Sequence, residues 1–382
     1  MREVVVTGVG ALTSAGMGHE VLRQRAVGGA PARHEVERTL PAPPGQPATP
    51  PVRVAALPPY DPAEHLGKKG IRTLSAESKA FGVAAVHACR HAGLPASWEQ
   101  DPSVGIAAGT TSGGLEDYAA LFAARLARGV RGVNPAQGPQ TGLNAPASAV
   151  SILTGAAGPN LTVSTGRAAA LDALAAAARA IDSGAATTML AGGVQLLGYA
   201  ELTARRRAAP GPGPGPEPGC GFETVAGEAA VVLVLEDAAA ARARGARPLA
   251  RLLGAGSAFG PPATRPGQRA AHAALGEAGM ARTTPTAPTT PTAPTAPAYP
   301  VPAVDAAFGD CAGATGAVQA ALTVLGLHHR TLPDDTALVL TTDSADPAEH
   351  AGPGSCATAL VLGTSGSGTP STGPSHQGGH SA

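Results

Sequence analysis

Short apolar runs alternate with stretches of helical periodicity along most of the chain, and each run is bounded by glycine or proline. The helix at 75–92 has the clearest boundaries, because it starts from a serine cap, Ser75, with Glu77 close behind, and closes before Gly93. The elements predicted in the first half are strands at 3–7, 101–108, 161–165 and 185–193 and helices at 75–92, 115–128 and 168–182. The first of these strands is expected to end in a glycine-rich turn from Gly8 to Gly10. Strands that alternate with helices in this way predict an α/β fold with mixed or parallel sheets.

The predicted helix at 168–182 consists almost entirely of small residues, so neighbouring backbones can pack closely on every side of it. We therefore place it between two sheets. A loop, a small-residue helix at 317–325 and a strand at 336–341 repeat this order about 145 residues later, which indicates an internal duplication. Terminal strands at 227–236 and 357–363 complete the two halves. The expected architecture is a pair of duplicated β/α halves in a layered αβαβα arrangement.

Proline-rich and glycine-rich segments mark the expected boundaries of these halves. We expect an N-terminal half at 1–245 and a shortened C-terminal half at 246–364. Within the second half, the Thr/Pro/Ala segment 281–302 is expected to be an extended or disordered linker, because regular prolines forbid a helix. The tail 365–382 is expected to be disordered. The proline-rich stretch from Leu40 to Pro59 is expected to be a surface excursion without regular structure.

Composition and charge narrow the function classes. Hydrophobic residues make up 43% of the chain but aromatic residues only 3%, so Ala, Val and Leu must build the core. Basic and acidic residues number 27 each, and no basic stripe carries interleaved aromatics, so no nucleic-acid partner is expected. The densest basic run, from Ala204 to Ala209, is expected to be a solvated helix end, with docking of an acidic carrier protein left open.

The four cysteines are scattered and show no ligand spacing, so neither a disulfide scaffold nor a metal site is expected, and no cofactor is predicted. The N-terminus enters a strand pattern at once and lacks the basic-then-apolar order of a signal peptide. No glycine-free apolar stretch approaches the length of a membrane span. We therefore expect a cytoplasmic protein with no membrane partner.

Six motifs, in order, carry a resemblance to a known family: VVVTGVGALTSAG at the start, GTTSGG at 109, GPNLTVST at 158, DSGAATTMLAGG at 182, GEAAVVLVLED at 227 and CAGATGAVQAAL at 311. With these motifs the chain resembles the beta-ketoacyl synthase (ketosynthase) branch of the thiolase superfamily. The resemblance implies a thiolase-like fold. It also implies a family of acyltransferases that extend acyl chains on an acyl carrier protein.

The resemblance fails at the family's nucleophile. A cysteine at the start of a buried helix is expected there, because the helix N-terminus and free backbone N–H groups lower the pKa of its thiol. Here the segment 164–168 places Arg167 at that position. A guanidinium is not nucleophilic at any attainable pH. Three interpretations remain open: a local ion pair after loss of function, a contact with an anion or carrier thioester, or a shifted alignment with catalysis elsewhere.

The other catalytic positions differ as well. The resemblance places Asp310 at a family histidine, where a carboxylate would repel the enolate that the imidazole stabilises. Asp305 stands at the usual lysine, and the segment 281–302 replaces the other histidine motif. The gate loop is Gly352-Pro353-Gly354-Ser355, without the family's phenylalanine. Cys311 and Cys356 are candidate substitute nucleophiles, but we interpret both as ordinary small buried residues. No catalytic residue is therefore expected.

The leading functional hypothesis is a non-condensing subunit similar to a chain length factor. Such a subunit would pair with an active ketosynthase as a heterodimer, or with itself, and would serve an acyl carrier protein. The candidate tunnel or interface residues are Tyr118, Leu121, Phe122 and Thr165, and ordinary interface packing explains them equally well.

Three alternatives stay open. The first is an acyltransferase or decarboxylase that uses Asp310 or Cys311, and the second is a degenerate paralogue. The third is a Rossmann-type oxidoreductase, which Gly8 and Gly10 suggest, although Thr13 stands where that motif needs a glycine.

Overall fold

The computed structural model describes residues 2–26, 33–40, 51–208, 225–261, 264–280, 301–342 and 355–365. Its strands are β1 (Val4–Thr13), β2 (Gly16–Met17), β3 (Glu35–Arg38), β4 (Val52–Ala55), β5 (Val104–Gly109), β6 (Asn160–Val163), β7 (Thr188–Gln195), β8 (Ala226–Gly227), β9 (Ala229–Asp237), β10 (Ala250–Gly260), β11 (Thr336–Thr342) and β12 (Ser355–Thr364).

Its α-helices are α1 (His19–Ala26), α2 (Pro62–Leu66), α3 (Ala76–Ala92), α4 (Leu115–Arg128), α5 (Ala145–Thr154), α6 (Ala169–Asp182), α7 (Tyr199–Ala208), α8 (Ala238–Ala243), α9 (Pro266–Glu277), α10 (Val301–Phe308) and α11 (Thr315–His328). Short 3₁₀ turns connect several of them: η1 (Ile71–Thr73), η2 (Val130–Gly132), η3 (Pro135–Thr141), η4 (Gly166–Ala168) and η6 (Ala312–Ala314). The helices predicted at 75–92, 115–128 and 168–182 are confirmed to within one residue at each end.

The main sheet is mixed and has the strand order β11-β12-β10-β1-β9-β7-β5-β6, with β2 folded back on β1. Strand β5 runs parallel to β6 and β7, and the other neighbours are antiparallel. Strand β1 pairs with β10 over Val4–Val6 alone, whereas it pairs with β9 along nearly its whole length. The sheet therefore opens into two lobes, β10-β12-β11 and β1-β9-β7-β5-β6, which are joined only at the start of β1.

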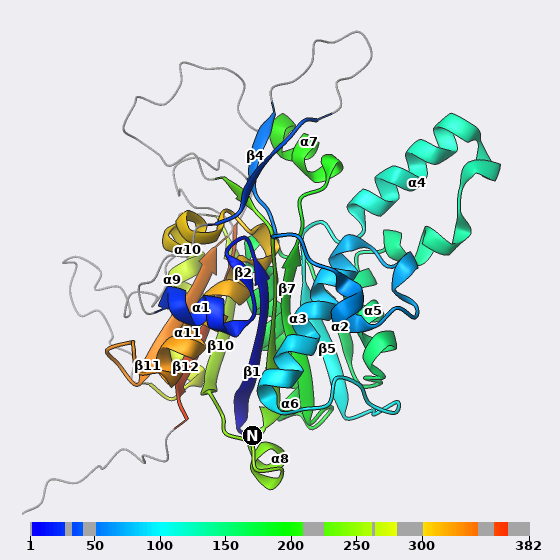
Figure 1. Ribbon diagram of the computed structural model, residues 1–382. Coiled ribbons are helices and arrows are strands. Elements are labelled where there is room, and N and C mark those ends of the chain that lie inside the picture. The colour runs from blue at the N-terminus through cyan, green and yellow to red at the C-terminus, as the bar shows by residue number, and fades with distance from the viewer. Residues whose placement is uncertain are drawn as a thin grey trace, which may run out of the picture.

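Helices α6 and α11 lie between the two lobes (Figure 1). Helix α6 contacts β5 and β7 of one lobe and β10 and β12 of the other, and α11 packs against it. Helices α3 and α5 cover the outer face of the larger lobe, and α9 covers the outer face of the smaller one. This is the predicted αβαβα layering, with the helix at 168–182 in its central layer. Nine of the fourteen residues of α6 are buried, and most of them are alanine.

Two glycines near the N-terminus have a different role from the predicted one. We expected the first strand to end at a turn from Gly8 to Gly10, but β1 continues through both residues to Thr13. A Cβ on Gly10 would lie 2.0 Å from the carbonyl oxygen of Ala84, and one on Gly8 would lie 2.3 Å from that of Ala88. Both glycines therefore allow α3 to pack directly on the strand. They form no phosphate-binding turn, which removes the motif behind the oxidoreductase alternative.

The stretch from Leu40 to Pro59 was predicted to lack regular structure, and this is wrong for its second part. Strand β4 pairs with β3 and β8 in a small second sheet. The buried Glu228 carboxylate anchors this sheet, because it accepts the backbone N–H groups of Leu57 and Leu197 and pairs with Arg38 at 2.9 Å. Of the predicted linker 281–302, residues 281–300 lie outside the described residues, and the last two were predicted wrongly, because Val301 and Pro302 begin helix α10, where the first turn tolerates a proline. Of the predicted tail 365–382, residues 366–382 lie outside the described residues.

No helix in the described ranges has the length and apolar character needed to cross a bilayer. The apolar core instead runs through the two lobes and their buried helices.

Candidate functional site

The segment between β6 and α6 forms a tight elbow. Gly166 adopts a left-handed backbone with φ of 62°, which turns the chain into η4 and then into α6. The Thr165 hydroxyl donates to the Asp172 carboxylate at 2.6 Å, so the elbow is tied to the first turn of the helix that it introduces. Asp172 also accepts hydrogen bonds from Ser257 of β10 and Thr358 of β12. The elbow is thus fixed to both lobes.

Arg167 lies in this elbow, and two carboxylates hold its guanidinium. Nη2 donates to Asp305 at 2.6 Å and Nη1 donates to Asp310 at 2.8 Å. The side chains of Arg167 and Asp305 are 15% and 8% exposed, so the pair is largely shielded from water. A cation at a helix N-terminus is electrostatically unfavourable, and the two carboxylates compensate for it. A local ion pair, which was one of the three interpretations of Arg167 left open by the sequence, is thus present.

A second arginine extends the cluster. Arg205 of α7 donates to the other oxygen of Asp310 at 3.2 Å and to Glu201 at 2.8 Å. The expectation that the run from Ala204 to Ala209 is simply a solvated helix end is therefore wrong for Arg205, although it was reasonable from the charge pattern alone. Burial alone would lower the pKa of Arg205, but Asp310 and Glu201 raise it above its usual value. Three carboxylates and two guanidiniums form one connected network.

Asp305 is the most strongly shifted acid of this network. Burial raises its pKa to about 6, and the neighbouring Asp310 acts in the same direction, while Arg167 and Arg205 oppose the shift. Its Oδ1 atom is buried and accepts no hydrogen bond from the residues that the structure describes. One oxygen of this carboxylate is therefore satisfied by Arg167, and the other carries the cost of burial.

The cysteines near the site are poor nucleophiles. Cys311 follows Asp310, but its side chain is fully buried and its thiol donates to the carbonyl of Gly309. Burial raises the pKa of the Cys311 thiol well above its usual range, and Asp310 and Asp305 add to this effect. Cys89 lies inside α3, where burial raises its pKa to about 12. Neither thiol forms the thiolate that nucleophilic attack requires.

Cys356 is half-buried on β12, opposite Phe259 of β10. The gate-loop candidates Gly352, Pro353 and Gly354 lie outside the described residues, and Ser355 begins β12 and pairs with Gly260. The described part of the chain contains no group of three or more His, Cys, Asp or Glu side chains arranged to hold a metal.

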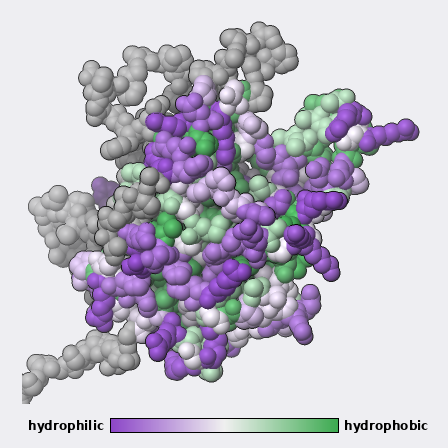
Figure 2. All heavy atoms as spheres, in the orientation of Figure 1, coloured by the Kyte–Doolittle hydropathy of each residue, from purple (hydrophilic) through white to green (hydrophobic). Residues whose placement is uncertain are grey.

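Three of the four tunnel or interface candidates lie away from the elbow. Tyr118, Leu121 and Phe122 belong to α4, which projects from the body of the protein, whereas Thr165 lies in the elbow (Figure 1). The rings of Tyr118 and Phe122 stack with centroids 6.4 Å apart, and these side chains are 55% and 47% exposed. Figure 2 shows apolar surface on this projecting hairpin among hydrophilic side chains. The three α4 residues line an outer face.

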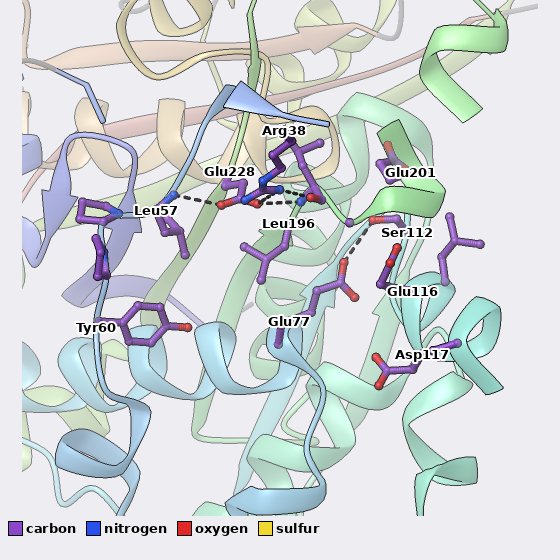
Figure 3. A pocket seen from close by; sticks show the side chains of 17 residues that line it. Arg38, Leu57, Tyr60, Glu77, Ser112, Glu116, Asp117, Leu196, Glu201 and Glu228 are labelled. Atoms are coloured by element: carbon purple, nitrogen blue, oxygen red, sulfur yellow. Dashed lines mark hydrogen bonds and ion pairs between the residues drawn. The ribbon is translucent and has the colours of Figure 1, made fainter. Parts of the chain in front are cut away.

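A cavity of about 530 Å³ lies between α3, α4, the start of α7 and the segment at 57–60 (Figure 3). Sequence reasoning did not find it. Glu77 was noted only as the acid that follows a helix cap, yet its carboxylate faces this cavity and accepts hydrogen bonds from Ser112 and Gly114. The available signal was a cluster of acids, Glu116 and Asp117, directly after a glycine-rich turn.

Comparison with known proteins decides the family. The family model for the beta-ketoacyl synthase N-terminal domain matches residues 1–241. This chain belongs to the beta-ketoacyl synthase family. Its thiolase-like fold agrees with that assignment.

Sequence relatives include the 3-oxoacyl-[acyl-carrier-protein] synthase 2 of Vibrio harveyi, which is 33% identical over 207 residues that make up 52% of this chain and 50% of the relative. A putative polyketide beta-ketoacyl synthase 1 of Streptomyces halstedii is 30% identical over 66% of this chain and 62% of the relative. The matched region thus spans only about half the length of the Vibrio relative.

Solved structures of similar fold include the ishigamide ketosynthase/chain length factor, with a TM-score of 0.72, 22% identity and coverage of 96% of this chain and 100% of that one. Another is a ketosynthase in complex with its chain length factor from Xenorhabdus doucetiae, with a TM-score of 0.65, 18% identity and coverage of 95% and 98%. At this identity the likeness concerns the fold.

The ion cluster makes Arg167 important for stability. We expect Arg167→Met to lower the free energy of unfolding by about 3 kcal/mol, because the shielded Asp305 loses its ion-pair partner and Asp310 keeps only Arg205. Chemical denaturation of both proteins measures the change. Arg23→Met is the matched control, since Arg23 pairs with Glu20 at the surface and its loss should cost less than about 1 kcal/mol. Similar losses for the two variants would contradict a buried role for the cluster.

Asp305 should make stability depend on pH. Its folded-state pKa of about 6 lies above the usual aspartate value of about 4, so the folded protein holds this proton more tightly than the unfolded chain. Its contribution to the free energy of unfolding is therefore greatest below pH 4 and is lost as the pH rises through 6. Asp305→Asn should remove this slope, as urea denaturation between pH 4 and 7.5 would measure.

The exposed Asp334→Asn is the control and should retain the slope of the wild-type protein. A change in the overall stability of Asp305→Asn shifts the whole curve of unfolding free energy against pH and leaves its slope unaffected. A wild-type slope in Asp305→Asn would show that this carboxylate does not hold the extra proton.

Proposed function

We propose that this chain is a non-condensing, ketosynthase-like subunit of polyketide or fatty-acid synthesis, similar in role to a chain length factor. The observation that carries the proposal is the ion cluster of Arg167, Asp305 and Asp310. In our assignment these residues occupy the family's nucleophile, lysine and histidine positions. The side chain in the elbow is then a guanidinium held by two carboxylates, which cannot accept an acyl group.

The cluster also argues against the other interpretations of Arg167. An anionic ligand would have to displace Asp305 or Asp310 from the guanidinium, and the network already carries three acids against two bases. A decarboxylase would need to stabilise an enolate, and the Asp310 carboxylate beside the elbow would repel it. Cys311 is too deeply buried to replace the missing nucleophile. These contacts favour a role in assembly over a role in chemistry.

The edge of the large lobe offers a surface for a related subunit. Strand β6 is the last strand of the sheet, and among the described residues it pairs only with β5. An open strand edge invites pairing with another chain. Leu161 on β6 itself and Ile152 on α5 are exposed apolar residues. The stacked rings of Tyr118 and Phe122 on α4 add further exposed apolar surface. We propose that an active ketosynthase covers this face. One solved structure of similar fold is a ketosynthase in complex with its chain length factor, which supports a partner of this kind.

The same side of the protein carries a surface suited to an acidic carrier protein. Every lysine of the chain lies between residues 68 and 79, and Lys68, Lys69 and Arg72 are exposed around η1. This turn contacts η3, which packs against α4, where Arg125 and Arg128 are also exposed. Clustered cations attract an acidic partner and speed its association. We propose that the acyl carrier protein docks here rather than at the run that contains Arg205.

Assembly with a partner tests the proposal. Co-expression with a ketosynthase from a neighbouring gene should yield a heterodimer, and Phe122→Glu should weaken it at least about tenfold by burying a charge in the interface. Size-exclusion chromatography with light scattering measures both. Phe259→Glu is the matched control, because Phe259 is also exposed, at 68% against 47% for Phe122, but lies at the end of β10, in the other lobe.

A stable monomer in the presence of every such neighbour would contradict the proposal. Wild-type assembly by Phe122→Glu would place the interface elsewhere.

A further inference from the structure

The cavity beside α3 and α4 shares Glu201 with the ion cluster, but Arg167, Asp305 and Asp310 do not line it. Its volume of about 530 Å³ falls within the range of small-molecule sites, which is roughly 300–1,000 Å³. Its lining mixes two kinds of side chain. The apolar ones belong to Leu57, Pro58, Pro59, Tyr60, Leu115, Leu196 and Leu197. The carboxylates belong to Glu77, Glu116, Asp117, Glu201 and Glu228, and Arg38 is the lining cation.

Two of these carboxylates are already matched by cations. Glu228 pairs with Arg38 and accepts two backbone N–H groups, so it anchors the small sheet. Glu201 pairs with Arg205 and belongs to the ion cluster. Neither needs a ligand. These two pairs use the guanidinium groups of Arg38 and Arg205.

The other three carboxylates, those of Glu77, Glu116 and Asp117, form no ion pair with a cation of the described chain. Glu116 accepts the backbone N–H of Ala200, and Lys79 near Asp117 gives only a distant attraction. Glu77 is the most shielded, and its hydrogen-bond donors are all neutral: the Ser112 hydroxyl and the backbone N–H groups of Gly114 and Leu196.

Burial is the main cause that raises the pKa of Glu77 to about 7, against an ordinary value of about 4.3. Burial also raises the pKa of Asp117, with help from Glu116. A shielded carboxylate without a cation is unfavourable in its charged form, and either a proton or a cationic ligand removes this cost. Figure 3 shows Tyr60 and Glu77 approaching the space from opposite sides, with Leu196 between them.

We propose that this cavity binds a small organic amine in its ammonium form, with the charged nitrogen toward Glu77 and Asp117 and the apolar body against Tyr60 and Leu196. The ammonium N–H groups would donate to the carboxylates, and such charge-assisted hydrogen bonds are among the strong ones. The Tyr60 ring offers a further favourable face to a cation. Carboxylate or phosphate ligands are disfavoured by the same acids.

Isothermal titration calorimetry of the full chain at pH 8 tests the proposal with three probes of similar shape: 2-phenylethylamine, 2-phenylethanol and 3-phenylpropionate. The amine should bind at least about tenfold more tightly than the alcohol, and the acid should be the weakest ligand. Glu77→Gln should reduce amine affinity at least about tenfold. The control Glu99→Gln, which removes an exposed carboxylate outside the cavity, should leave it unchanged.

Absence of amine binding, or equal binding of the amine and the alcohol, would overturn the proposal. If Glu77→Gln does not fold because it loses the hydrogen bonds to Ser112 and Gly114, the amine affinity of Asp117→Asn decides the test. Loss of amine affinity in that variant supports the site, and unchanged affinity overturns it. The titration uses this chain alone, so its result does not depend on assembly with a partner.

Discussion

The guanidinium of Arg167 imposes the main constraint on this structure. An arginine stays charged at every relevant pH, so a fold that shields it must supply opposite charge at hydrogen-bonding distance. Asp305 and Asp310 do so from the end of α10 and the loop after it, whereas Arg167 stands at the start of α6. The elbow of the first half and the corresponding loop of the second half are therefore joined by charge. In our proposal this is also the point at which the family's chemistry has been lost.

Close packing of small residues makes this contact geometrically possible. A Cβ on Gly193 of β7 would lie 2.7 Å from the Ala170 side chain and 2.9 Å from Ala314, and one on Gly316 would lie 2.6 Å from Leu171. At these positions the central helices and the η6 turn are therefore too close to one another for any side chain larger than that of glycine. Because α6 and α11 share the middle layer, the residues at their N-terminal ends meet. The same scarcity of large side chains that identified α6 in the sequence allows Asp310 to reach Arg167.

Local features could be predicted from the sequence, and features that depend on tertiary contacts could not. The limits of α3, α4 and α6 followed from periodicity and capping, and the central place of α6 followed from its small residues. Gly8 and Gly10 were misassigned, because a glycine needed for a turn and one needed for helix contact look the same in sequence. Arg205 looked solvated because its partner Asp310 is 105 residues away. The cavity at Glu77 combines residues from α3, α4, the start of α7 and the segment at 57–60, so no single motif identifies it.

The account depends on whether any side chain of this protein can accept an acyl group. The most direct measurement is intact-mass spectrometry of the purified chain, with its partner ketosynthase present, after incubation with an acyl-loaded carrier protein. The account predicts that this chain keeps its unmodified mass while the partner becomes acylated. An acyl adduct on a cysteine of this chain would contradict it.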